Sequence, residues 1–188
     1  SGAGARVIGM ASACFAAATI LLISLHAVST GLRPVRDAVS DYGTTPYHRR
    51  YRAMAVLLGA GAILLAIGLT RDTNARDVFW LWVYGVSRIA IAGFMTDRSP
   101  PPVTPEGRIH WLLAAVAFTA IAFAAVNIRW AGDPALLHGL GYAVAASAVA
   151  TLLTRAVPPF RPVFGLVERL LYVTSIAWLV IAAVSLAA

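Results

Sequence analysis

Six apolar segments dominate this 188-residue chain, and each is close to the length that crosses a bilayer. About 20 helical residues span the hydrocarbon core, because each residue rises about 1.5 Å along a helix. The segments cover approximately residues 7–30, 53–70, 78–95, 109–128, 135–154 and 163–187. A lone strand cannot satisfy its backbone polar groups in lipid, and the alternating pattern of a β-barrel is absent. The sequence therefore predicts an all-α, polytopic membrane protein: a bundle of six transmembrane helices forming a single domain over residues 1–188.

The composition agrees with this fold class. The chain is 60% hydrophobic and only 12% charged, whereas soluble domains carry about 25% charged residues. The net charge of +7 comes from arginines between the apolar segments, which indicates membrane topology and lipid contact rather than nucleic-acid binding. Cys14 is the only cysteine, so an intramolecular disulfide is impossible and a structural zinc–thiolate site is implausible. The first segment is too long for a removable signal peptide and is expected to remain in the membrane.

Six crossings would put both chain ends on one side of the membrane. The opposite side, called the loop face here, then carries residues 31–50, 94–113 and 155–164. Ten arginines lie near the loop face and four near the other, so the positive-inside rule taken alone places the loop face in the cytoplasm. Arginines that serve a binding site would bias this count, and the orientation stays open.

Two charged residues lie within apolar segments. Arg88 is in the third segment and Glu168 in the sixth, at comparable depth from the loop face. An unpaired charge in the hydrocarbon costs at least ~2.5 kcal/mol, so each side chain must pair, reach the interface or line a wet cavity. A direct ion pair between Arg88 and Glu168 is therefore predicted, either as a structural link or as part of a site.

The stretch "FMTDRSPPPVTPEGRIHWLL" (94–113) gathers Asp97, Glu106, Arg108 and His110 around a run of prolines. Prolines end one helix, and Thr104 can cap the next, so the stretch is at least a helix stop and start. The same polar residues could instead face a shared pocket on the loop face.

Three motifs resemble one known family over essentially the whole chain. They are "VSDYG" after the first segment, "GFMTDRSPPPVTPEGRIHWLLA" in the third loop and "GLVERLLYVTSIAWLVIAA" in the last segment. They are similar to an uncharacterised family of small bacterial and archaeal six-helix membrane proteins, the domain of unknown function nine hundred and ninety-eight. Thr96 and Asp97 match its Phe-Pro-Thr-Asp pattern, while Met95 stands where proline is usual. The resemblance implies a six-helix fold in a bacterial plasma membrane and brings no established reaction. Many members of the family carry their basic residues on the face that holds the chain ends, whereas this chain carries most of them on the loop face.

The convergence of polar residues on the loop face favours a site that binds, and could modify, a lipid or another anionic amphiphile. Arginines would surround the headgroup while the helices shelter the tail. The candidate binding residues are Ser40, Asp41, Tyr42, Arg88, Arg108 and Glu168, and the candidate acid and base are Asp97 and His110. Membrane lipids, and partner membrane proteins in addition, are the expected partners, with no nucleic acid.

Two alternatives remain open on the sequence alone. The chain could be a non-catalytic subunit or assembly factor that docks on a larger membrane complex through its alanine-rich helix faces. It could also be a metal-dependent membrane hydrolase, with His26, His110 and Asp97 as metal ligands. A metal ion is thus a possible but not favoured cofactor. Haem and nucleotides are not expected, because histidines at matching depth and nucleotide-binding loops are absent.

Overall fold

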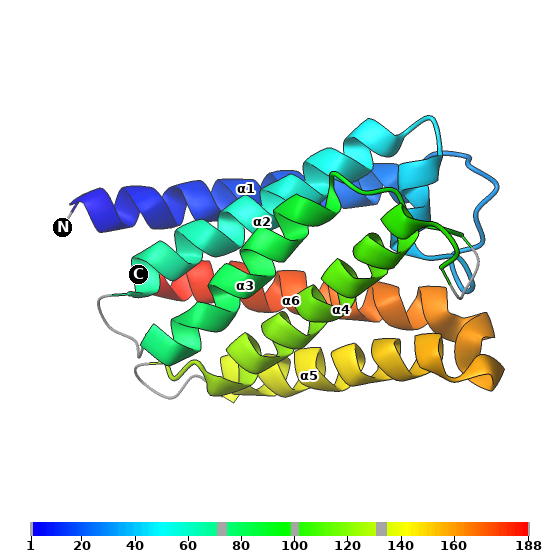
Figure 1. The fold of residues 1–188 in the computed structure, drawn as a ribbon. Coiled ribbons are helices and arrows are strands. Elements are labelled where there is room, and N and C mark those ends of the chain that lie inside the picture. The colour runs from blue at the N-terminus through cyan, green and yellow to red at the C-terminus, as the bar shows by residue number, and fades with distance from the viewer. Residues whose placement is uncertain (1, 71–74, 99–101, 131–134, 188) are drawn as a thin grey trace.

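The computed structural model describes residues 2–70, 75–98, 102–130 and 135–187 (Figure 1). Its long helices are α1 (Gly2–His26), α2 (His48–Leu69), α3 (Ala75–Ile91), α4 (Pro105–Asn127), α5 (Ala135–Ala156) and α6 (Phe164–Ala187). Two short 3-10 helices, η1 (Val39–Thr44) and η2 (Pro158–Val163), lie in the loops, and no strand occurs in the described ranges. Arg71 from the charge count, and Pro100 and Pro101 from the third loop, lie outside the described residues.

The prediction of an all-α, polytopic membrane protein is confirmed. Five helical stretches are long and apolar enough to cross a membrane: α1, α2, α4, α5 and the combined stretch Pro158–Leu186. The sixth long helix, α3, has 17 residues and carries Asp77 and Arg88, so it falls short of the usual ~20-residue span. All six predicted segments nevertheless coincide with long helices, because apolar length is a local property of the chain.

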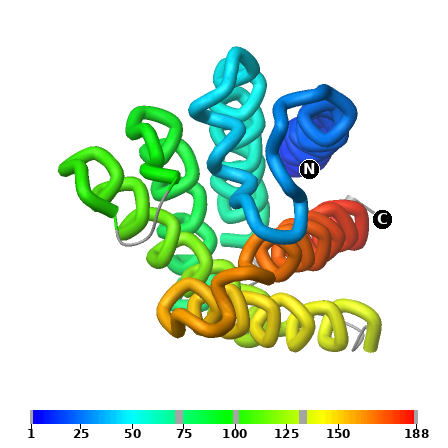
Figure 2. Tube along the Cα trace, turned by 90° about the vertical axis from the view of Figure 1, so that its right-hand side faces the viewer, coloured from blue at the N-terminus to red at the C-terminus, as the bar shows by residue number. Residues whose placement is uncertain are grey.

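The helices form a ring in chain order. Each long helix packs against the next, and α6 closes the ring by packing against α1 (Figure 2). Figure 1 shows both chain ends at one end of the bundle and the loops around η1 and η2 at the other. The loop face is therefore the end of the bundle that lies opposite the chain ends.

A glycine contact sets the position of α3 against α2. A Cβ atom on Gly59 would lie 2.5 Å from the carbonyl oxygen of Gly85, and one on Gly85 would lie 2.8 Å from the carbonyl oxygen of Gly59. Only glycine permits backbones to approach this closely, as is common between membrane helices. Because Gly85 lies about one turn before Arg88, this contact helps to position Arg88 inside the bundle.

Candidate functional site

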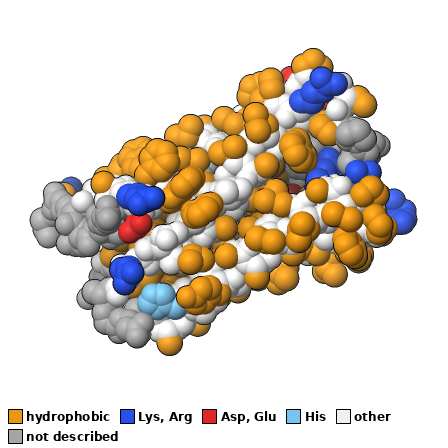
Figure 3. Space-filling model, turned by 60° about the horizontal axis from the view of Figure 1, so that its bottom comes forward, with side chains coloured by type: hydrophobic (Ala, Val, Ile, Leu, Met, Phe, Trp, Pro, Cys, Tyr) orange, Lys and Arg blue, Asp and Glu red, His pale blue; other side chains and the backbone are white. Residues whose placement is uncertain are grey.

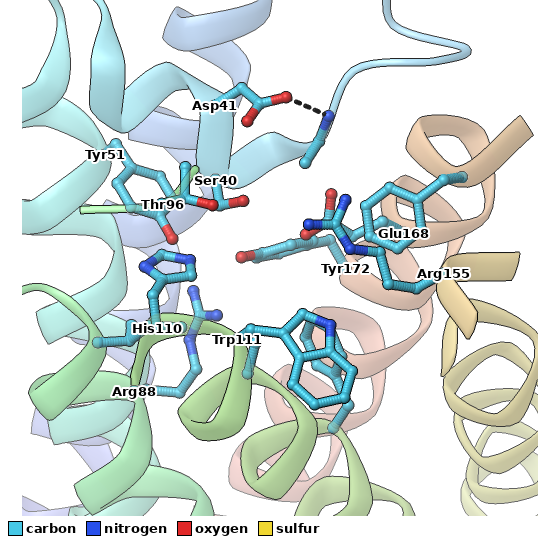
Figure 4. Close-up of a pocket in the computed structure, with 15 residues that line it drawn as sticks. Ser40, Asp41, Tyr51, Arg88, Thr96, His110, Trp111, Arg155, Glu168 and Tyr172 are labelled. Carbon is cyan, nitrogen blue, oxygen red and sulfur yellow. Dashed lines mark hydrogen bonds between the residues drawn. The ribbon is translucent and has the colours of Figure 1, made fainter. Parts of the chain in front are cut away.

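A small cavity lies inside the loop-face end of the bundle (Figure 4). We call it the inner chamber, and its polar lining includes Asp41, Tyr51, Arg88, His110, Glu168 and Tyr172. These side chains come from five elements, namely η1, α2, α3, α4 and α6. The chamber has a volume of about 30 Å³. Since one water needs ~10–15 Å³, the chamber has room for about two waters.

Arg88 is the most deeply buried charge of the chamber, with only 1% of its surface exposed. Its guanidinium lies over the ring of Tyr172, 5.2 Å from the ring centroid. Its Nε and Nη2 atoms have no hydrogen-bond partner among the described residues. The guanidinium therefore keeps an unused donor edge inside the protein.

The predicted direct ion pair between Arg88 and Glu168 is wrong. Both side chains line the chamber, but no salt bridge joins them in the described part of the chain. Glu168 instead accepts a hydrogen bond from the backbone N–H of Val39 at 2.6 Å. The backbone of the first loop, residues 27–47 between α1 and α2, thus binds the carboxylate that was expected to pair with Arg88.

Asp41 and Glu168 both hold the loop backbone at the chamber. Asp41 accepts a hydrogen bond at Oδ2 from the N–H of Ala38, 2.8 Å away, next to the Val39 N–H that Glu168 binds. Burial raises the pKa of Asp41 to about 6, although the Ala38 N–H and the positive charge of Arg155 oppose this. The two carboxylates therefore fix η1 as the cover of the chamber, and Asp41 does so at the cost of its own desolvation.

His110 offers an acceptor to the chamber. Its Nδ1 lies 2.9 Å from the carbonyl oxygen of Phe94 and must donate, because a carbonyl oxygen only accepts. In the neutral ring this assigns a lone pair to Nε2. Nε2 is buried and lacks a hydrogen-bond partner within the described ranges. His110 thus remains a candidate base whose free nitrogen lies in the chamber.

Asp97 is tied to its own loop and does not line the chamber. Its Oδ2 accepts hydrogen bonds from the backbone N–H groups of Val103 (2.8 Å) and Thr104 (2.9 Å). The Thr104 N–H contributes most to lowering the pKa of Asp97 below its ordinary value. Thr104 in turn caps α4 by accepting from the N–H of Gly107 at 3.0 Å, and a Cβ on Gly107 would collide with Asp97 Oδ2. Asp97 therefore organises the start of α4, one turn before His110.

The proposed metal ligands are not brought together. His26 Nε2 accepts a hydrogen bond from Arg169 Nε at 2.8 Å, and His26 Nδ1 donates to the carbonyl oxygen of Leu22 at 2.8 Å. Its ring also packs edge-on against Tyr42, at 5.4 Å between centroids. Among the described residues, no group of three His, Cys, Asp or Glu side chains is placed to hold a metal ion. His26 and Tyr42 thus support the first loop, while Ser40 lines the chamber.

A wider groove adjoins the chamber between α4 and α5. We call it the lateral groove, and it has a volume of about 580 Å³. Its lining residues are Pro102, Arg108, Trp111, Leu112, Arg155, Ala156 and Arg161. The helices touch where Gly141 meets the carbonyl of Ala125, and Figures 1 and 2 show them diverging from there toward the loop face. Figure 3 shows the hollow at this end of the molecule, with arginine side chains at its margin.

Two residues connect the chamber with the groove. Trp111 of α4 and Arg155 of α5 line both cavities, so they form the wall between them (Figure 4). Arg155 and Arg161 also line a third cavity, of about 90 Å³, beside Asp41. Sequence reasoning counted Arg155 only as a topology signal and missed Tyr51 and Trp111. The sequence did contain a signal for Arg155, which lies in the last turn of an apolar helix. No local feature of the sequence distinguished Tyr51.

Comparison with known proteins adds a family but no activity. A family model described as "Protein of unknown function (DUF998)" matches residues 9–185, nearly the whole chain. No curated protein and no solved structure matches the chain. The motifs in the first loop, the third loop and the last helix therefore indicated the correct family, and the chain belongs to the DUF998 family of membrane proteins.

Proposed function

We propose that the protein binds an anionic amphiphile in the lateral groove. The headgroup lies among Arg108, Arg155 and Arg161, and the tail follows the apolar side chains of Trp111 and Leu112. The proposal rests on one observation: the lateral groove is lined by both arginines and apolar side chains, and it lies at the loop-face end of a membrane bundle.

The charge of the groove supports an anionic headgroup. Three of its lining residues are arginines, and none of the described residues that line it is acidic. Arg108 and Arg155 have no ion-pair partner within the described part of the chain. Guanidinium groups bind phosphate or carboxylate oxygens through paired N–H donors, and such charge-assisted bonds are stronger than neutral ones. The unpaired arginines are thus available to an anion.

The apolar wall supports an amphiphile rather than a soluble anion. Leu112 is 59% exposed and Trp111 is 41% exposed, although both lie in a helix long and apolar enough to span the membrane. Tryptophan is enriched where headgroups meet hydrocarbon, because its ring is apolar and its N–H is polar. An acyl chain would cover these side chains while its headgroup stays beside the arginines.

Native mass spectrometry of the delipidated protein in detergent tests the proposal. Phosphatidylglycerol should bind more tightly than phosphatidylcholine, which has no net charge. Arg161→Ala should weaken phosphatidylglycerol binding by roughly tenfold, since a hydrogen bond to a charged group contributes about 1.5–3 kcal/mol. Arg52→Ala is the matched control, because Arg52 is an exposed arginine of α2 that lines neither cavity. Equal binding of both lipids, or equal effects of both substitutions, would refute the proposal.

A further inference from the structure

The inner chamber holds more free hydrogen-bonding capacity than a structural role requires. The Nε and Nη2 atoms of Arg88, the hydroxyl of Tyr51 and Nε2 of His110 are all buried and lack partners among the residues the structure describes. Proteins satisfy nearly all of their buried polar atoms, and a group left unsatisfied is costly. All four atoms belong to residues that line one chamber, whereas the three other such atoms of the described residues, on Trp130, Arg169 and Trp178, belong to residues outside it, so the cluster indicates the place of a ligand.

The free atoms of Arg88 have a specific geometry. Nε–H and one N–H of Nη2 point in the same direction along one edge of the planar guanidinium, and this edge matches the two oxygens of a carboxylate. The guanidinium also lies over the ring of Tyr172, with its Cζ 5.2 Å from the ring centroid. The unused edge therefore favours a planar oxyanion over a single neutral acceptor.

The two carboxylates of the chamber do not use this edge. Asp41 and Glu168 each accept a backbone N–H from the first loop, and neither forms a salt bridge with Arg88 in the described part of the chain. Three of the four free atoms, Nε and Nη2 of Arg88 and the hydroxyl of Tyr51, can donate, and only Nε2 of His110 is an acceptor, so the free capacity of the chamber mainly suits an acceptor. A carboxylate also fits the available space, which holds about two waters.

We propose that the inner chamber binds a carboxylate at the end of the amphiphile's headgroup, with Arg88 as its anchor and the Tyr51 hydroxyl as a second donor. The inference rests on the proposed function and deepens it: the ligand carries one anionic group for the lateral groove and a terminal carboxylate for the chamber. In this proposal the headgroup passes between Trp111 and Arg155, which border both cavities, so that its carboxylate lies beside Arg88 and its phosphate beside Arg155 and Arg161.

Three phospholipids provide matched probes. Phosphatidylserine and phosphatidylglycerol carry the same net charge, but only phosphatidylserine ends in a carboxylate. Phosphatidylethanolamine is phosphatidylserine without that carboxylate. Binding to the full chain in detergent should be tightest for phosphatidylserine, with an advantage of about tenfold over phosphatidylglycerol from the bidentate contact.

Two substitutions test the chamber without removing its volume. Tyr51→Phe deletes a hydroxyl that has no partner among the described residues, so the fold should be kept. Arg88→Lys keeps the charge and removes the paired donor edge. Both should abolish most of the preference for phosphatidylserine and leave phosphatidylglycerol binding unchanged, whereas Arg161→Ala should weaken both lipids.

The outcomes separate the two proposals. Equal binding of phosphatidylserine and phosphatidylglycerol to the wild-type protein would overturn the carboxylate site and leave the groove intact. Phosphatidylethanolamine binding as tightly as phosphatidylserine would also overturn it, because the ammonium group would then be recognised by Asp41 or Glu168. Sodium acetate tests the carboxylate without a lipid, and sodium chloride is the control salt. If acetate protects the wild-type protein from thermal unfolding more than chloride does, and Tyr51→Phe removes this difference, the carboxylate site in the chamber is supported even if no lipid binds to the groove.

Discussion

Replacing Asp41 by asparagine should stabilise the protein at neutral pH. Asp41 lies in η1, outside the long helices, and its burial raises its pKa from the ordinary 3.8 to about 6. Each unit of difference in pKa corresponds to about 1.4 kcal/mol, so the ionised carboxylate destabilises the fold by about 3 kcal/mol at pH 7. Asparagine has nearly the same shape and keeps a carbonyl oxygen that can accept the N–H of Ala38.

The sign follows from which state binds the proton more tightly. The folded state holds the Asp41 proton up to a pH of about 6, whereas the unfolded chain releases it near 3.8. Between these values the folded state binds more protons, so the free energy of unfolding falls as the pH rises. The wild-type protein should therefore lose stability relative to Asp41→Asn as the pH rises from about 3.8 to about 6. At higher pH it should remain less stable than Asp41→Asn.

Thermal unfolding in detergent from pH 4 to pH 8 measures this difference. At pH 7 the Tm of Asp41→Asn should exceed that of the wild type by roughly 6–12 °C, since 1 kcal/mol shifts the Tm of a protein of this size by about 2–4 °C. Asp37→Asn is the control, because it removes a loop carboxylate by the same chemical change. A Tm difference between wild type and Asp41→Asn that stays constant with pH, or that favours the wild type at pH 7, would refute the reasoning.

Three further predictions concern the loops and the topology. Gly107→Ala should lower the Tm and increase hydrogen exchange at the start of α4, because overpacking costs about 1–3 kcal/mol; the effect should be smaller when Asp97→Ala is already present. Glu168→Leu should destabilise the protein by about 1–3 kcal/mol by leaving a buried backbone N–H of the first loop without its acceptor, whereas Glu168→Gln should cost less in the same unfolding assay. Cysteines introduced at Ala3 and Ser185, without the native cysteine, should react with an impermeant maleimide from the same side of the membrane; labelling from opposite sides would contradict the six-crossing topology.

The helices and their approximate limits followed from the sequence. An apolar run of about 20 residues must become a helix in lipid, because no other local structure satisfies its backbone polar groups. The concentration of polar side chains at one end of the bundle could be inferred too, since alternate loops of an even-numbered bundle share a face. Burial of Arg88 was also predictable, because a charge within an apolar helix must turn away from the hydrocarbon.

The partners inside the site depended on the tertiary structure. The sequence suggested that Arg88 neutralises Glu168, since the two charges are opposite and lie at similar depth. In the folded protein the N–H of Val39 reaches that carboxylate, and Asp97 is bound by backbone N–H groups of its own loop rather than facing His110. A backbone donor carries no signature in the amino-acid sequence, so this competition could not be foreseen.

The lateral groove depended on tertiary structure for a different reason. Trp111, Arg155 and Arg161 come together because α4 and α5 touch near Gly141 and diverge toward the loop face. Apolar length and residue spacing determine that each helix forms and which face it turns inward. They do not determine the angle at which two helices cross, which results from how closely their side chains pack along the whole contact. The sequence by itself thus determined a membrane bundle with a polar end, and only the packing of its helices decided that this end contains a buried chamber beside a groove.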